Sequence, residues 1–236
     1  MAATAESCAA RYGVSREAQD EYAARSQQLA ARAWVEGRFA DEVVAVEVKG
    51  RKGTEAFAAD DHLRPETTPE SLAKLPPAFS KSGCVTAGNA SGIVDGGAAL
   101  ILASEDGVRR HGLAPMARLV AWGTVGVEPA LMGMGPAPAA RLALERASLT
   151  LGDIDLIEIN EAFAAQYLAV EQELGLDRDR VNVNGGAIAL GHPLGMTGTR
   201  LLLTLALELR RRGLRRGLAA ACIGGGQGIA AIIERA

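Results

Sequence analysis

The sequence predicts a layered α/β fold, in which a mixed sheet is flanked by helices, together with a loop-rich α+β excursion domain. From residue 117 onward, short apolar and β-branched runs alternate with helical patterns of about 10–15 residues, which is typical of α/β proteins. Of the 236 residues, 48% are hydrophobic and 22% charged, and 28 are glycine, as in a globular, turn-rich chain. The irregular, proline-bearing stretch 49–77 does not suit the core of a sheet and predicts the excursion.

One clear helix is predicted in the first part of the chain, over residues 15–36. Ser15 suits the N-cap, and Gly37 ends the periodic pattern. Three further segments follow it: a strand over 43–48, a turn over 49–53, and a buried helix or strand over 96–105.

The second part of the chain alternates between strands and helices. Strands are predicted over 117–124, 154–159, 181–184, 218–223 and 229–234. Helices are predicted over 137–147, 161–174 and 197–212, the last of them strongly amphipathic. Only a tight glycine turn separates the last two strands, so we expect them to form a hairpin.

Charge, cysteine content and hydropathy exclude several classes of protein. The net charge of −3 provides no basic surface for nucleic acid. The three cysteines lack paired spacing, which argues against a disulfide framework or a metal site and favours a reducing, cytoplasmic setting. The first residues lack the basic and apolar regions of a secretory signal. Glycines interrupt the most apolar stretch, 218–233, so no membrane span is expected.

Three clusters of residues with possible chemistry each follow a predicted strand: 160–164, 184–195 and 222–228. Loops at the carboxyl ends of strands are where α/β proteins gather ligands and catalytic groups. Each cluster also has a structural interpretation. Asn160 could be a helix N-cap, His192 a structural histidine, and Cys222 a buried, inert thiol. The functional alternative is that Cys222 acts as an acid or base and that glycine N–H groups near it face an oxyanion.

Together these clusters resemble the carboxy-terminal signatures of the thiolases, the acetyl-CoA acetyltransferases. The matching segments are Asn160-Glu161-Ala162-Phe163, the run 184–189 with Gly191-His192-Pro193, and Cys222-Ile223-Gly224-Gly225-Gly226. Residues 85–92 are similar to the family's coenzyme A loop, and residues 12–48 to its loop domain. The resemblance spans essentially the whole chain.

The resemblance implies an enzyme that makes or breaks the carbon–carbon bond of a 3-ketoacyl-CoA through an acyl-enzyme thioester. It implies that His192 activates the nucleophilic thiol, Asn160 holds an oxyanion-site water, Cys222 transfers the α-proton, and the Gly224 N–H serves a second oxyanion hole. Coenzyme A contacts are implied at Arg64, Ala87, Ser91 and Phe163, and an acyl-pocket wall at Met132. Coenzyme A thioesters are then the substrates, with no separate cofactor and no metal.

The resemblance also implies a division of the chain into a loop domain over 1–92, a remnant of the amino-terminal thiolase domain over 93–114, and a carboxy-terminal domain over 115–236. Neither Cys8 nor Cys84 sits in a context that resembles the family's nucleophile. We therefore expect the amino-terminal half to be missing and the isolated chain to be inactive.

Two alternatives remain at this point: a non-catalytic acyl-CoA-binding or accessory subunit, and a Cys222–His192 hydrolase dyad. The expected partners are acyl-CoA or coenzyme A, and either further copies of the chain in a homo-oligomer or an amino-terminal thiolase half.

Overall fold

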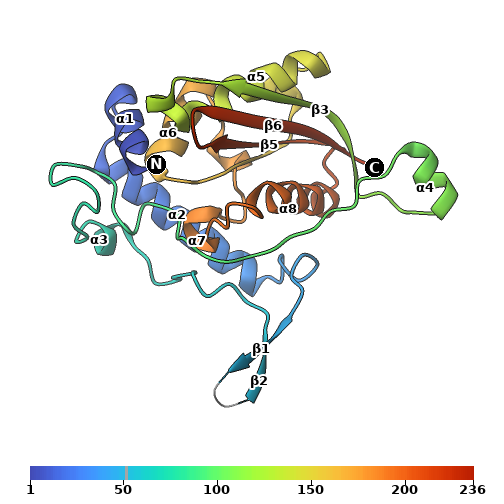
Figure 1. Cartoon of the computed structure of the whole chain (residues 1–236), viewed down its shortest axis with the longest axis horizontal. Helices are drawn as coiled ribbons and strands as arrows, with labels where there is room; N and C mark the ends of the chain where they lie inside the picture. Colours follow the sequence, from blue (N-terminus) through green and yellow to red (C-terminus); the bar gives the residue numbers. More distant parts are fainter. Residues whose placement is uncertain (51–52) are drawn as a thin grey trace.

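A four-stranded mixed sheet forms the centre of the molecule (Figure 1). The computed structural model describes residues 1–50 and 53–236. The strand order is β3 (Ala117–Gly126), β6 (Gln227–Arg235), β5 (Arg216–Ile223) and β4 (Leu156–Ile159). The β3–β6 and β6–β5 pairs are antiparallel, whereas β4 runs parallel to β5. The β5–β6 hairpin confirms the prediction made from the two closing apolar runs.

Helices cover both faces of this sheet. On one face lie α5 (Pro136–Ala147) and α6 (Ala164–Leu174), and on the other lies α8 (Thr197–Arg212) (Figure 1). Side chains along β5 point alternately to the two faces of the sheet. Leu218 packs in the core with α5 and α6, whereas Ala219 packs against the leucines of α8 on the other face. The mixed sheet flanked by helices is therefore confirmed.

The first part of the chain adds helices that pack on this body and a hairpin that projects from it. Here α1 (Ala2–Tyr12) contacts α6, and α2 (Arg16–Val35) contacts the short α7 (Ala187–Leu190). Strands β1 (Val46–Gly50) and β2 (Gly53–Phe57) pair antiparallel, with every residue exposed. Shorter helices are α3 (Pro69–Leu72), α4 (Glu105–His111), η1 (Pro129–Met134), η2 (Leu151–Asp153) and η3 (Arg178–Arg180).

Most predicted elements are confirmed, with small shifts of their ends. Ser15 caps α2 and accepts a hydrogen bond from the Ala18 N–H at 3.2 Å. The predicted helix 197–212 is found with both ends unchanged. The first strand starts three residues later than expected, at Val46. The turn predicted over 49–53 includes Arg51 and Lys52, which lie outside the described residues.

Several predictions are wrong. Residues 96–103 form no helix or strand and are exposed, because no described element packs on them; Ser104 then caps α4. Residues 181–184 make only isolated bridges to β4 and to Gly185. Helices α1 and α4 are not predicted from the sequence. Asn160 does not cap α6, because that helix begins at Ala164 with Phe163 in the cap position.

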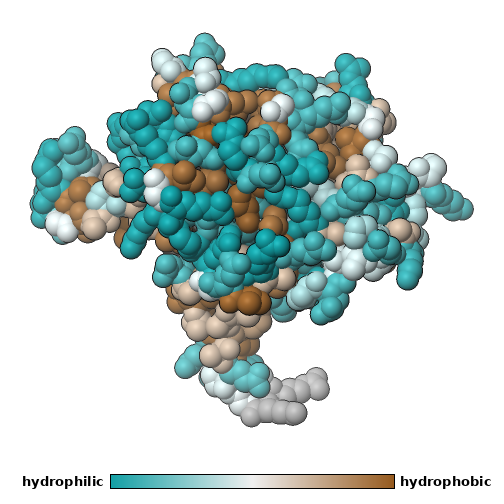
Figure 2. Space-filling view, turned by 180° about the vertical axis from the view of Figure 1, so that it is seen from behind, coloured by the Kyte–Doolittle hydropathy of each residue, from teal (hydrophilic) through white to brown (hydrophobic). Residues whose placement is uncertain are grey.

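Among residues 1–50 and 53–236, no helix is long and apolar enough to cross a membrane. Figure 2 shows the molecule from behind, where hydrophobic residues reach the surface in several places between hydrophilic ones, including the base of the β1–β2 hairpin.

Candidate active site

His192 lies in a loop directly after α7, and the chain around it is closely packed. Gly191 adopts φ 90°, a left-handed conformation that favours glycine, and a Cβ there would collide with Val94. The His192 N–H donates to the Gly92 carbonyl at 3.2 Å. The imidazole is therefore placed by segments about 100 residues apart in the sequence.

Both ring nitrogens of His192 have partners. Nδ1 lies 2.7 Å from Thr197 Oγ1, and Nε2 lies 3.2 Å from Asn160 Nδ2. An amide nitrogen can only donate, so Nε2 accepts and Nδ1 carries the proton. The Thr197 hydroxyl in turn donates to the Pro193 carbonyl at 2.9 Å, which leaves its oxygen free to accept from Nδ1. The contacts thus select one neutral tautomer.

The electrostatic surroundings favour the neutral imidazole. Burial lowers the pKa of His192 below its usual 6.5, and the nearby Arg200 guanidinium lowers it further. Nε2 therefore carries the one lone pair of the ring, which accepts from Asn160 and can act as a general base when that hydrogen bond is exchanged for a proton donor.

Asn160 occupies the carboxyl end of β4 and is fully buried. Its backbone N–H donates to the Ala220 carbonyl at 2.9 Å, which continues the ladder between β4 and β5. The side-chain amide donates toward His192, while Oδ1 has no hydrogen-bond partner among the described residues. The sheet thus aims a polar side chain at the imidazole and leaves one buried acceptor available.

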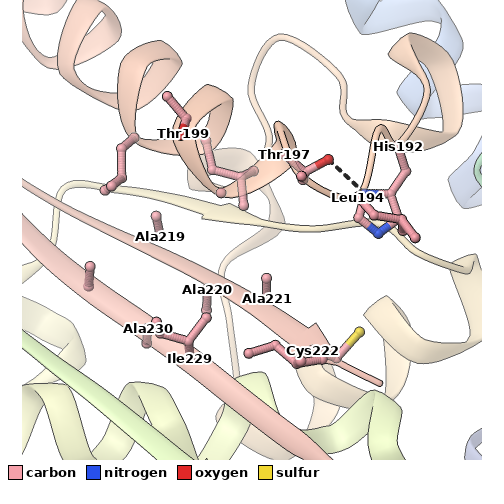
Figure 3. Close-up of a pocket in the computed structure, with 16 residues that line it drawn as sticks. His192, Leu194, Thr197, Thr199, Ala219, Ala220, Ala221, Cys222, Ile229 and Ala230 are labelled. Carbon is pink, nitrogen blue, oxygen red and sulfur yellow. Dashed lines mark hydrogen bonds between the residues drawn. The ribbon is translucent and has the colours of Figure 1, made fainter. Parts of the chain in front are cut away.

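Cys222 lies near the end of β5 and shares a cavity of about 420 Å³ with His192 (Figure 3). The sulfur and the imidazole project toward the same space from the strand and from the loop, and the cavity is otherwise lined mainly by apolar side chains such as Leu194 and Ile229. Burial raises the pKa of the Cys222 thiol to about 12, so the thiol is protonated at neutral pH. Gly224 begins the turn after β5.

The residues expected to contact coenzyme A are only partly brought together. Ser91 donates to the Ala162 carbonyl from its N–H at 3.1 Å and from its hydroxyl at 3.0 Å, so it lies beside Phe163. Ala87 is exposed in the same loop. Arg64 is exposed and its guanidinium donates to nearby carbonyls, while Met132 is buried in η1, away from the lining of the cavity.

Sequence reasoning missed two residues that hold this site. Thr197 orients the imidazole, and only its place five residues after His192 would indicate this, since a threonine in the first turn of a helix is usually read as part of its cap. The helix predicted over 161–174 places Glu161 in its first turn, yet Glu161 precedes α6 and is fully buried. Among residues 1–50 and 53–236, no group of three or more His, Cys, Asp or Glu residues could hold a metal ion.

Comparisons with known proteins show which family the chain resembles. The family model "Thiolase, C-terminal domain" matches residues 113–235, and "Thiolase, N-terminal domain" matches residues 1–106. The chain is 55% identical over 234 residues to the mitochondrial 3-ketoacyl-CoA thiolase of Homo sapiens, and equally identical to the acetyl-CoA acetyltransferase of Shinella zoogloeoides. These alignments cover 99% of this chain but 59% and 60% of the two relatives.

Solved structures show the same fold. A crystal structure of human mitochondrial 3-ketoacyl-CoA thiolase superposes with a TM-score of 0.98 at 54% identity, over 100% of this chain and 60% of that one. The structure of the same enzyme in complex with CoA gives 0.97 at 53% identity, over 100% of this chain and 59% of that one.

The comparisons also correct one expectation. Because the amino-terminal family model matches residues 1–106, the idea that the amino-terminal half is missing is not supported. The chain spans about 60% of the length of these relatives, and the domain boundaries predicted at residues 92 and 114 stay predictions. With a family model that matches more than half of its residues, the chain belongs to the thiolase family.

Proposed function

We propose that this chain functions in a thiolase-type acyltransferase that forms or cleaves the carbon–carbon bond of a 3-ketoacyl-CoA. The observation that supports this best is the convergence of three groups from separate elements: the imidazole of His192, the amide of Asn160 and the thiol of Cys222. The names of the relatives, 3-ketoacyl-CoA thiolase and acetyl-CoA acetyltransferase, point to the same reaction.

In the cleavage direction, a thiolate attacks the keto carbon, the bond to the α-carbon breaks, and its electron pair passes to the departing acetyl-CoA carbanion. We assign Cys222 as the acid that protonates this carbanion, because its raised pKa keeps the thiol protonated. Before this step His192 activates the attacking thiol, as Nε2 gives up its hydrogen bond from Asn160 and takes the thiol proton. Asn160 Oδ1, which no described residue contacts through a hydrogen bond, suits a water bound in the oxyanion site, and we assign the Gly224 N–H to a second oxyanion site.

The nucleophile itself is proposed to be none of the three cysteines of this chain. Cys8 is fully buried, and burial raises the pKa of its thiol to about 11. The Cys84 thiol donates to the Glu6 carboxylate at 3.0 Å. Cys222 is needed as the acid. The 236-residue chain is therefore expected to cleave no acetoacetyl-CoA by itself.

Spectrophotometric cleavage of acetoacetyl-CoA by the purified chain tests this proposal. We expect turnover at the blank rate with coenzyme A present, and the same rate for the His192→Ala and Cys222→Ser variants. Turnover within the usual enzymatic range of about 1–1000 per second, abolished by either variant, would show that the nucleophile is present in the chain.

A second candidate, acyl-CoA binding without turnover, is favoured by the order of the 85–92 loop. The Thr86 N–H donates to Asn89 Oδ1 at 2.8 Å, and Asn89 Nδ2 donates to Asp20 at 3.0 Å, so the loop is fixed before any ligand arrives. Calorimetric titration with coenzyme A, compared with the Ser91→Trp variant, distinguishes binding from its absence.

The hydrolase alternative has less support. A Cys222–His192 dyad needs a thiolate beside an imidazolium, whereas burial raises the pKa of the thiol and lowers that of the imidazole, so both groups stay neutral. Location in the cytoplasm stays a prediction, and the human relative is mitochondrial by its name.

A further inference from the structure

Glu161 is a buried carboxylate that accepts hydrogen bonds from four donors. Oε1 accepts from the Tyr22 hydroxyl at 2.7 Å and from Asn182 Nδ2 at 3.0 Å. Oε2 accepts from the Ser26 hydroxyl at 2.7 Å and from the Ile188 N–H at 3.1 Å. Its exposed fraction is 0%. A buried carboxylate with this many donors fixes the relative position of every element that supplies one.

The Oε2 side of Glu161 holds the segment that leads to His192. Besides its bond to the carboxylate, Ser26 accepts the Gly186 N–H at 3.1 Å. A Cβ on Gly186 would lie 2.6 Å from Glu161 Oε1, so only glycine allows this approach. Gln27, next along α2, donates to the Ile188 carbonyl at 3.1 Å. Helix α2 thus binds the start of α7 at two points, the Gly186 N–H and the Ile188 carbonyl, six and four residues before His192.

The Oε1 side holds different structure. Asn182 donates to the Ile159 carbonyl at 2.9 Å and accepts the Ile159 N–H at 2.9 Å, so Oε1 is tied to the end of β4. The Tyr22 hydroxyl oxygen also lies 3.1 Å from Asn182 Nδ2, whose two hydrogens are shared among this oxygen, Glu161 Oε1 and the Ile159 carbonyl. The two oxygens of one carboxylate therefore serve two distinct segments.

We propose that Glu161 is a positioning residue, whose Oε2 contacts with Ser26 and Ile188 hold His192 within hydrogen-bonding distance of Asn160. Glu161 follows Asn160 directly in the chain, so a single residue anchors the strand end that carries the amide and, through α7, the loop that carries the imidazole. The proposal rests on the proposed function for its meaning, since these two side chains are assigned there to the oxyanion site and the base.

Two hydroxyl deletions form a matched pair for the test. Ser26→Ala and Tyr22→Phe each remove one hydrogen bond donated to Glu161 and one accepted from a neighbouring N–H group. Of the two, only Ser26 binds Glu161 Oε2, the oxygen that also binds α7, the helix that precedes His192. Imidazole ¹⁵N spectra of the full chain report the tautomer and the titration midpoint, with the His192 signals identified by their loss in His192→Gln.

We expect Ser26→Ala to mix the two tautomers of His192 and to move its midpoint upward toward the ~6.5 of a free histidine. Tyr22→Phe is expected to lower the melting temperature by a similar amount while leaving the His192 signals unchanged, because Asn182 keeps both of its hydrogen bonds with Ile159 and the end of β4 stays in place. Ser26→Thr, which keeps the hydroxyl, should restore the wild-type spectrum.

Unchanged His192 signals in Ser26→Ala, or equal changes in both variants, would overturn the proposal and leave Glu161 a purely structural residue. If Ser26→Ala does not fold, Ser26→Cys keeps a weak donor of similar size and should show the same change at smaller amplitude; wild-type signals there would overturn it too. The spectra require no turnover, so a failure of the proposed function would appear separately, in the acetoacetyl-CoA assay.

Discussion

The imidazole of His192 is held at both nitrogens, and the two partners act differently. Asn160 comes from the sheet and donates to Nε2, whereas Thr197 comes from the first turn of α8 and accepts a hydrogen bond from the Nδ1–H group. Because neutral histidine has one donor and one acceptor, this pair of partners selects the tautomer with a basic Nε2. Without the threonine hydroxyl, both neutral tautomers of His192 should be populated.

Thr197→Val keeps the shape of the side chain but leaves the Nδ1 proton buried without an acceptor. Loss of such a partner costs about 1–3 kcal/mol of the free energy of unfolding, and the ring is expected to populate both tautomers. Urea denaturation and imidazole ¹⁵N spectra measure the two effects. Thr204→Val is the control, because Thr204 lies on the same helix and donates to Glu42 instead, at 2.6 Å. A change of tautomer in the control as well would contradict this account.

The lowered pKa of His192 also predicts a pH dependence of stability. The unfolded chain binds a proton at this residue near pH 6.5, whereas the folded chain does so only at lower pH. Over that window the unfolded state holds more protons, so this residue makes the free energy of unfolding rise with pH and level off above about 6.5. Urea titrations between pH 5 and 8 should show a steeper rise for the wild type than for His192→Gln. Parallel curves would mean that the pKa is not lowered.

The site could be predicted only in part because its contacts are tertiary. The motif around Asn160 suited a helix cap equally well, and only the path of the chain after β4 excludes that role. The burial of Glu161 depends on four donors, two of them in α2 more than 130 residues earlier in the sequence. The association of Ser91 with Phe163 was implied by the resemblance alone. Local sequence patterns carry no information about contacts between residues so far apart in the chain.

Helices and strands with a strong periodic pattern of apolar residues were predicted well. Helix α8 has a continuous stripe of leucines and ends at Gly213, which adopts the left-handed conformation at φ 66°, so sequence and structure agree at both ends. Segment 96–105 has apolar residues but no periodicity, and composition alone wrongly predicted burial. Helix α1 was missed because its small residues give a weak pattern, and it is its packing against α6 and η1 that stabilises it.

The packing of α8 on β5 gives a prediction about the sheet. A Cβ on Gly217 would lie 2.6 Å from Leu205 Cγ, so Gly217→Ala should cost about 1–3 kcal/mol by overpacking. Leu205→Ala alone should cost about 2–5 kcal/mol through the cavity that it leaves. The double variant should cost less than the sum, because each change relieves the other. Urea denaturation of the four proteins measures this coupling, and strict additivity would show that the two residues do not meet.

The molecule as a whole leaves a run of apolar side chains uncovered. Ile93, Ile101 and Leu102 are 104%, 90% and 84% exposed on the segment that runs along the outside of the body before α4 (Figure 1). Single exposed apolar residues are ordinary, but several on one irregular segment indicate a surface that another chain or segment covers. This agrees with the expected homo-oligomer or association with further thiolase sequence, which stays a prediction.

Self-association of the purified chain is the test of that surface. We expect the mass from light scattering to rise with protein concentration and a hydrophobic dye to fluoresce on binding. The double variant Ile101→Lys/Leu102→Lys should lower both signals, because charged side chains at these positions oppose a dry contact. Val35→Lys is the control, since Val35 is 88% exposed but lies at the end of α2, outside the segment. A monomer at every concentration, with no bound dye, would mean that these side chains are simply solvated, and the body formed by the sheet and its helices would then need no further chain to cover it.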